Sequence, residues 1–325
     1  GGDVMMDLSA KSVMAWTRLG MRKSFGSMMQ VLARDDARII VMTADLAASA
    51  GLKDFAEEFP ERFFNLGIAE QNMTGVAAGL AKEGYTVFIV SFAPFVSMRA
   101  YEAVRTLVGY MGLNVKVVGM GSGLSLGFQG NTHYGLEDIA LMRMIPGMTV
   151  LSPADCADEA RCLMYLITHE GAAYLRLTGI DGSPAVLPKD VAFTVGKLTP
   201  VRVGEDLLII GTGSVTGECV RMARALKKDD ISCAIYHATS LKPLDLSEID
   251  DSLNMYRLVV TVEEHFIDGG LGGIVAEHLS ARRSHPPLLR FGISDVFPHA
   301  DTYANLLAQC GLTAARMRET ILRKH

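Results

Sequence analysis

Residues 65–84, NLGIAEQNMTGVAAGLAKEG, place the acid Glu70 and the amides Gln71 and Asn72 ahead of a run of very small side chains. The run predicts a helix that begins near Glu70 and that another backbone can approach closely. Glu70 has three interpretations. It is an exposed first-turn glutamate that complements the helix dipole, a member of an ordinary ion pair, or a buried acid kept for chemistry.

Short apolar segments surround this helix and alternate with helical stretches. Residues 38–42 (RIIVM), 85–90 (YTVFIV) and 114–120 (NVKVVGM) have the composition of buried strands, whereas residues 9–32 and 95–110 have helical spacing. Such alternation is typical of a mostly parallel sheet with helices on both faces. We therefore predict an α/β fold.

The chain of 325 residues is longer than one core usually holds, which favours two domains. Residues 1–182 form the first predicted α/β domain. The pattern lapses in residues 183–204, where Gly, Pro, Asp and Lys are frequent, so we expect a linker there. In residues 205–325, strand-like and helical segments alternate again, so we expect a second α/β domain there with its own mostly parallel sheet.

The overall composition narrows the function classes. Hydrophobic residues make up 49% and charged residues 21%, as in a globular protein, and the net charge of −5 provides no basic surface for nucleic acid. No stretch has the roughly 20 mainly apolar residues of a membrane span, and no signal peptide is evident. Five cysteines without metal-like spacing indicate reduced thiols, so we expect a cytoplasmic protein.

Two glycine-rich motifs are better interpreted as turns than as ligand sites. GTGSVTGE, from Gly211, follows a predicted strand, but its glycine spacing does not fit the dinucleotide-binding fingerprint. EEHFIDGGLGG, from Glu263, contains acids and a histidine, but the spacing does not put three metal ligands on one face. We therefore predict no metal site within this chain.

Two other features have stronger functional alternatives. His133 follows Gly127 and Gly130 in the loop GFQGNTHYG, beyond a predicted strand, where open α/β sheets bind ligands. It is either a solvated loop residue or a ligand contact. Arg176 in YLRLTG is a charge in an apolar strand, so it either pairs structurally or binds an anion.

Together, GIAEQNMTGVAAGLA, SFAPFVSMRAYEAVR, GNTH, YLRLTG and VEEHFIDGGLGG resemble the C-terminal two-thirds of transketolase and the related 1-deoxyxylulose-5-phosphate synthases. The resemblance implies a pyrimidine-binding domain followed by a transketolase C-terminal domain. It also implies thiamine diphosphate as cofactor, which carries the carbon chemistry itself. By this resemblance, Glu70 is the acid that contacts a ring nitrogen of the aminopyrimidine and favours its imino tautomer.

The resemblance also assigns a cofactor pocket. Phe95, Met98 and Tyr101 lie three residues apart, on one face of a regular helix, and match the family's pocket for the flat pyrimidine ring. Core packing is the alternative interpretation of this stripe. Met98 replaces an aromatic residue that is usual in transketolases, although methionine can also pack on a ring.

Sugar-binding positions carry over from the family with two departures. His133 matches a residue that contacts the donor's oxygen atoms at the reacting end. An aspartate that reads a sugar hydroxyl is replaced by Gln129, and a phosphate-contacting histidine of transketolase is replaced by Gly121. The substrate-binding positions expected from the resemblance are Arg22, Asp45, Ser49, Gln129, His133 and Arg176.

The family's GDG motif, which holds the diphosphate through Mg²⁺, occurs nowhere in the sequence. We therefore expect a split enzyme, in which an N-terminal subunit carries GDG and holds Mg²⁺, and this chain is the C-terminal subunit. The small-residue helix after Glu70 suits a symmetric contact between two copies within an assembly of two chains of each kind. On its own, the chain should not turn over substrate.

The predicted reaction is transfer of a two-carbon ketol unit from a ketose, phosphorylated in our expectation, to an aldose. One alternative is a thiamine enzyme with a 2-oxoacid donor, either a deoxyxylulose-phosphate synthase type or the β subunit of a 2-oxoacid dehydrogenase. Ser122 stands where the synthases usually carry an arginine, and the dehydrogenase subunits lack the histidine loop. A non-catalytic scaffold is the third possibility.

Overall fold

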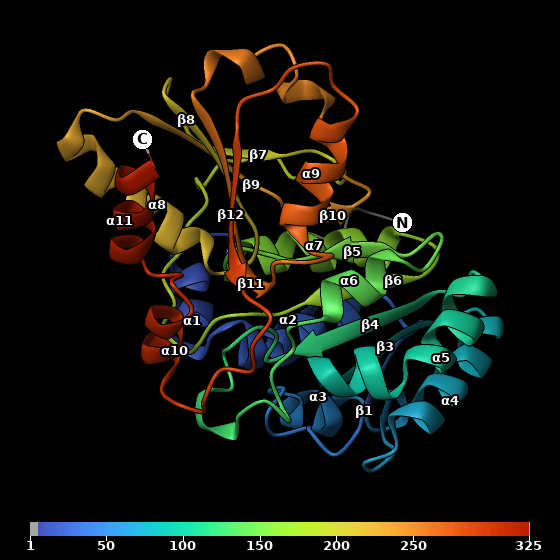
Figure 1. Cartoon of the computed structure of the whole chain (residues 1–325). Helices are drawn as coiled ribbons and strands as arrows, with labels where there is room; N and C mark the ends of the chain where they lie inside the picture. Colours follow the sequence, from blue (N-terminus) through green and yellow to red (C-terminus); the bar gives the residue numbers. More distant parts are fainter. Residues whose placement is uncertain (1–5, 325) are drawn as a thin grey trace.

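The structure, a computed structural model, describes residues 6–324. They form two α/β units, each with one sheet and helices on both faces, as the sequence predicts (Figure 1). In the first sheet the order is β10-β5-β6-β4-β3-β1-β2, and every pair is parallel except β10 with β5. Its strands are β1 (Ile39–Thr43), β2 (Phe63–Asn65), β3 (Thr86–Phe92), β4 (Val115–Met120), β5 (Thr149–Leu151), β6 (Ala173–Arg176) and β10 (Ser240–Lys242).

The second sheet has the order β12-β11-β8-β9-β7, with β7 antiparallel to β9 and the other pairs parallel. Its strands are β7 (Thr199–Arg202), β8 (Leu207–Gly211), β9 (Cys233–His237), β11 (Leu258–Phe266) and β12 (Leu288–Ile293). The domain boundaries at residues 182 and 205 remain a prediction, and two strands complicate them. β7 lies inside the expected linker, and β10 belongs to the first sheet although it follows β9 in the chain.

Helices cover both faces of the first sheet. Alternate residues of β1 enter two different cores: Ile40 and Met42 pack into one, and Ile39 and Val41 into the other. The helices of this unit are α1 (Ala10–Leu19), α2 (Met21–Asp35), α3 (Lys53–Glu58), α4 (Glu70–Lys82), α5 (Tyr101–Ala103), α6 (Asp138–Arg143) and α7 (Cys156–Thr168). Short 3₁₀ turns occur at Pro60–Arg62 (η1) and Gly127–Gln129 (η4).

The second unit packs on the first through a shared core. Leu208, Ile210 and Val259 of its sheet belong to the same hydrophobic cluster as Met73 of α4 and Ile89 of β3. Its helices are α8 (Thr216–Leu226), α9 (Leu271–Ser280), α10 (Tyr303–Gln309) and α11 (Ala314–Lys324), with 3₁₀ turns η5 (Lys227–Asp229), η6 (Ser247–Ile249) and η7 (Leu253–Met255).

Two helical predictions were too simple. The expected helix over residues 9–32 is broken at Gly20, whose φ of 73° favours glycine and where a Cβ would lie 2.9 Å from the Cα of Asp181. The expected helix over residues 95–110 contains two π-helical segments, Phe95–Arg99 (η2) and Val104–Tyr110 (η3), on either side of α5. π-helical turns inside a helix are often found at functional sites.

The carboxyl ends of the parallel strands β1, β2, β3, β4 and β6 meet at one edge of the first sheet. Open α/β sheets bind their ligands at this edge. No helix among residues 6–324 is long and apolar enough to cross a membrane.

Candidate functional site

Glu70 is the first residue of α4 and is buried, with 2% of its surface exposed. The hydroxyl of Ser91, near the end of β3, donates to Glu70 Oε1 at 3.1 Å. The guanidinium of Arg99 donates to Glu70 Oε2 at 2.9 Å. The exposed first-turn interpretation is therefore wrong, and Glu70 is a buried acid that also takes part in an ion pair.

An aromatic cluster lies beside this carboxylate. The Phe95 ring lies 6.2 Å from the Phe92 ring and 5.4 Å from the His133 imidazole, between ring centroids, and Phe92 and His133 are 5.9 Å apart. The Arg99 guanidinium lies over the Phe95 ring, 4.3 Å from its centroid. Because Arg99 also contacts Glu70, it joins the acid to the aromatic cluster that holds His133.

Of the three predicted pocket residues, only Phe95 is seen in this cluster. Met98 lies on the π-helical segment and is 40% exposed. Tyr101 packs on the core, and its hydroxyl donates to the carbonyl of Leu141 in α6 at 3.0 Å. The π-helical turn changes the angle between successive residues, so the predicted common face of a regular helix does not form. Roles for Met98 and Tyr101 at the cofactor remain proposals.

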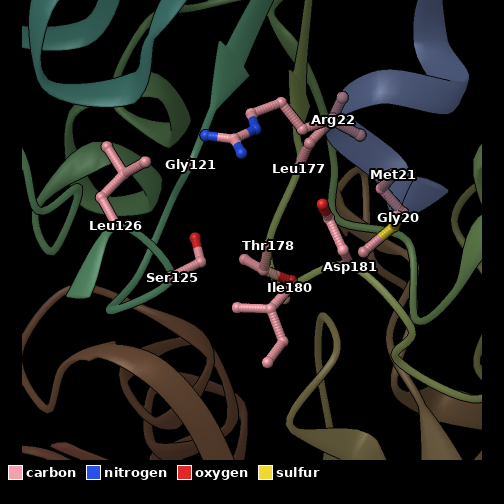
Figure 2. A pocket seen from close by; sticks show the side chains of 11 residues that line it. Gly20, Met21, Arg22, Gly121, Ser125, Leu126, Leu177, Thr178, Ile180 and Asp181 are labelled. Atoms are coloured by element: carbon pink, nitrogen blue, oxygen red, sulfur yellow. The ribbon is translucent and has the colours of Figure 1, made fainter. Parts of the chain in front are cut away.

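A pocket of about 320 Å³ opens where the α1–α2 junction meets the ends of β4 and β6. Arg22 and Gly121, both singled out from the sequence, line it together with Ser125, Thr178 and Asp181. Figure 2 shows the Arg22 guanidinium extending into the pocket.

The pocket contains a salt-bridged carboxylate, Asp181, and the guanidinium of Arg22. Lys23 Nζ lies 2.5 Å from Asp181 Oδ2, so that carboxylate is already neutralised. Arg22 has no carboxylate within salt-bridge distance among residues 6–324. The pocket can therefore hold an anion.

Gly121 is required by the backbone of this pocket. Its φ is +62°, and a Cβ there would lie 2.7 Å from the side chain of Leu126. A side chain at this position would require the loop or Leu126 to move, so the backbone here favours glycine.

Asp45, Ser49 and Gln129 lie on loops beyond the strands. Asp45 is exposed, has a φ of 61° unusual for a non-glycine residue, and accepts from Asn65 Nδ2 at 3.1 Å. Ser49 is half-buried, in a loop that packs tightly on α2. Gln129 is exposed at the end of η4. No hydrogen bond of the described residues links these three side chains to Glu70 or Arg22.

Arg176 is engaged mainly by groups of the chain itself. It is fully buried, and its Nε lies 3.0 and 2.9 Å from the two carboxylate oxygens of Asp138. Its Nη2 donates to the carbonyls of Gly135 and Glu264 at 3.2 and 2.7 Å. These contacts favour the structural alternative, whereas Nη1 has no hydrogen-bond partner among residues 6–324, so a role for Arg176 in substrate binding remains a proposal.

The VEEH segment of β11 also has a structural role. Glu264 accepts from the Leu124 amide, the Ser214 hydroxyl and the Tyr303 hydroxyl, and thereby holds the glycine-rich loop against the second unit. Burial raises the pKa of Glu264, and the Tyr303 hydrogen bond opposes this rise. Burial lowers the pKa of His265 to about 4. The region is a packed polar contact, and among residues 6–324 no cluster of three potential metal ligands exists.

Sequence reasoning missed Ser91, Phe92 and Arg99. Phe92 could have been found, because it is the first aromatic residue of the run SFAPF and ends a buried strand. Arg99 is a charge that follows shortly after this run. Its contact with Glu70, 29 residues earlier in the chain, is a tertiary feature that no local pattern predicts.

Comparison with known proteins gives a consistent picture. A family model for the transketolase pyrimidine-binding domain matches residues 17–180, and one for the transketolase C-terminal domain matches residues 196–317. A putative transketolase C-terminal section of Methanocaldococcus jannaschii is 41% identical, covering 93% of this chain and 95% of its own. The 6-deoxy-6-sulfo-D-fructose transketolase subunit SqwH of a Clostridium species is 36% identical, covering 90% and 91%. One subunit of the apulose-4-phosphate transketolase of Phocaeicola vulgatus is 35% identical, covering 87% and 90%.

Among solved structures, a split-gene transketolase described as an inactive beta4 tetramer is similar, with 38% identity and a TM-score of 0.86. The match covers 94% of this chain and 98% of that one. The transketolase of Campylobacter jejuni is 17% identical, with a TM-score of 0.77. There the match covers 94% of this chain but only 46% of that one, and this likeness concerns the fold alone.

Proposed function

The chain belongs to the transketolase family, and from this premise we propose that it is the C-terminal subunit of a split transketolase that uses thiamine diphosphate. The complex would transfer a two-carbon ketol unit from a ketose to an aldose. The observation that carries the proposal is the buried Glu70 carboxylate beside the cluster of Phe92, Phe95 and His133.

These residues fit the pyrimidine end of thiamine diphosphate. A flat heteroaromatic ring needs an aromatic surface and a carboxylate at its edge, and Phe95 and Glu70 provide both within one cluster. When bound, thiamine diphosphate supplies the carbanion chemistry of ketol transfer. Glu70 would hold a proton at the pyrimidine edge, Ser91 would orient its carboxylate, and His133 would contact donor oxygens.

We propose that the diphosphate and Mg²⁺ are held mainly by an N-terminal partner subunit that carries GDG. Relatives that match this chain over nearly their whole length are themselves named as sections or subunits of transketolases, which supports a divided enzyme. The split-gene relative named as an inactive beta4 tetramer supports the expectation that this chain alone is inactive. Measurable turnover by the purified chain with cofactor and Mg²⁺ would contradict it.

The type of reaction is tested with the reconstituted complex. We expect it to transfer a ketol unit from a ketose without releasing carbon dioxide. Deoxyxylulose-phosphate synthases are also relatives, at 32% identity over 93% of this chain. Release of carbon dioxide from pyruvate by the complex would favour that alternative, and absence of both reactions would favour a scaffold.

The substrate is proposed to be a sugar with a terminal tetrahedral anion. Arg22 provides a guanidinium that has no carboxylate partner among residues 6–324, in a pocket at the sheet edge, and such a group binds phosphate or sulfonate oxygens. The names of two relatives specify a sulfo-sugar and a sugar phosphate. Asp45, Ser49 and Gln129 lie on loops of the first unit and remain proposed contacts to the sugar.

Arg22→Gln is expected to raise KM for a phosphorylated ketose by about 10- to 100-fold, the loss of one charge-assisted hydrogen-bonding group. Steady-state kinetics of the complex would measure it. KM for the unphosphorylated sugar should change little. Arg18→Gln, at an exposed position on α1, is the matched control. An equal rise in KM for both sugars would show that Arg22 does not bind the anionic group.

We propose that α4 packs against another subunit. Its outward face carries Gly75, Val76 and Gly79, and a Cβ at Gly79 would meet no atom within 4 Å in the free chain. Exposed apolar side chains occur just before this helix, at Ile68 (75% exposed), and at the end of η3, which packs on α4, at Tyr110 (87% exposed). Close approach of a second backbone would cover these groups.

Gly79→Ala is therefore expected to have two opposite effects. It should raise the free energy of unfolding of the chain by about 0.5–1 kcal/mol, because alanine favours the helix. It should also weaken subunit association, because the new methyl group would enter the close contact. Denaturant unfolding and analytical ultracentrifugation measure the two effects. Lys82→Ala, exposed on the same helix, is the control, and unchanged association for Gly79→Ala would contradict the contact.

A further inference from the structure

Arg99 takes up the interactions that the proposed cofactor site offers to a ligand. Its Nη1 donates to Glu70 Oε2 at 2.9 Å, and its guanidinium carbon lies 4.3 Å from the centre of the Phe95 ring. Ser91 occupies the other Glu70 oxygen. Within the described structure, both oxygens of the buried carboxylate are therefore already engaged by the chain itself.

A guanidinium and an aminopyrimidine share the features that such a site recognises. Both are planar, both stack on aromatic faces, and both can form a hydrogen bond between an edge nitrogen and a carboxyl group. Phe95 and Glu70 provide one stacking face and one carboxylate edge. The two groups therefore compete for the same surfaces.

The Arg99 side chain is able to leave. It is 46% exposed, whereas the Glu70 side chain is 1% exposed, so the arginine can swing into solvent while the acid cannot. Its backbone is fixed independently, because Gln71 Nε2 donates to the Arg99 carbonyl at 3.2 Å. Because Glu70 is buried, its carboxylate needs a partner, and a bound aminopyrimidine would supply the hydrogen bond that Arg99 gives up.

We propose that Arg99 is a built-in competitor of the cofactor's aminopyrimidine: it caps Glu70 in the free chain and has to swing out before thiamine diphosphate is seated. The inference rests on the proposed function. It adds a regulatory contact, because the chain keeps its buried carboxylate paired with a cation until the cofactor replaces that cation.

The test is the affinity of the reconstituted complex for thiamine diphosphate at saturating Mg²⁺, measured by calorimetry. Arg99→Ala is expected to lower Kd about 3- to 10-fold, the range that a partly exposed ion pair can contribute. Arg99→Lys should lower Kd less, because it keeps the charge but loses the planar stack. Affinity for inorganic diphosphate should not change, since that ligand does not reach the pyrimidine site.

Arg105→Ala is the matched control, because Arg105 is exposed on the adjacent π-helical segment. Thermal unfolding of each variant checks that it is folded. An unchanged or higher Kd for Arg99→Ala would overturn the inference while leaving the proposed function intact. Failure of the wild-type complex to bind thiamine diphosphate would overturn both.

Discussion

Glu70→Gln in the reconstituted complex is expected to lower kcat by about 10²- to 10⁴-fold, the usual contribution of a positioned acid or base. Glutamine keeps the size of the side chain and can still accept from Ser91, but it cannot hold or accept a proton at the pyrimidine edge. The loss should therefore appear in kcat, with a smaller change in the Kd for thiamine diphosphate. Stopped-flow or steady-state assays of ketol transfer measure the first quantity, and calorimetry measures the second.

Glu83→Gln is the control for this variant. Glu83 is exposed at the other end of the same helix, where it forms the C-cap of α4, so its neutralisation should leave kcat unchanged. Thermal unfolding distinguishes a chemical loss from misfolding. If Glu70→Gln turned over within a few-fold of the wild type, catalysis through this acid would be wrong, and the scaffold alternative would gain support.

The architecture follows from local patterns that are strong in this chain. Apolar segments such as residues 38–42 are short and continuous, which indicates strands buried on both faces, and β1 does contribute alternate residues to two cores. The break at Gly20 and the π-helical turns at residues 95–110 escaped prediction. Both depend on contacts between distant segments: Gly20 lies against Asp181, and the second π segment packs on α4.

The residues alone left three interpretations of Glu70 open, and the resemblance to transketolase favoured a buried acid; Glu70 is buried. The role of an arginine in a strand was harder to predict. An arginine at the end of an apolar strand has at least two uses, anion binding and structural pairing. Which of them holds for Arg176 depends on Asp138, 38 residues earlier in the chain, so the choice needed the fold.

The Arg176–Asp138 pair is also a useful place to measure stability, because both side chains have no exposed surface. The Tyr174 hydroxyl donates to Asp138 Oδ2 at 2.8 Å. Burial raises the pKa of this tyrosine well above its usual value, and the Asp138 charge adds to that rise, so the hydroxyl stays a donor. The carboxylate therefore balances the one charge of Arg176 while accepting from a neutral neighbour.

Asp138→Asn is expected to lower the free energy of unfolding by about 3–5 kcal/mol, because it leaves the Arg176 charge buried without a counter-charge. Arg176→Met combined with Asp138→Asn should cost less than the sum of the two single changes, since no lone charge remains. Denaturant unfolding of the isolated chain measures all three variants. Glu58→Gln is the control, because the Arg34–Glu58 pair has similar distances, 2.7 Å for each bond, but is partly exposed, and its loss should cost no more than about 1 kcal/mol.

The same variants separate the structural role of Arg176 from a role in substrate binding. If Arg176 bound phosphate, its substitution would raise KM for the phosphorylated sugar, as expected for Arg22→Gln. The free energy of unfolding of the chain would then change little. If Arg176 is instead a buried ion-pair member, Arg176→Met should lower the free energy of unfolding. At a temperature where this variant stays folded, the complex should keep its KM for the phosphorylated sugar. A stable Arg176→Met chain with a KM raised tenfold or more would return Arg176 to the anion site and remove Asp138 as its obligatory partner.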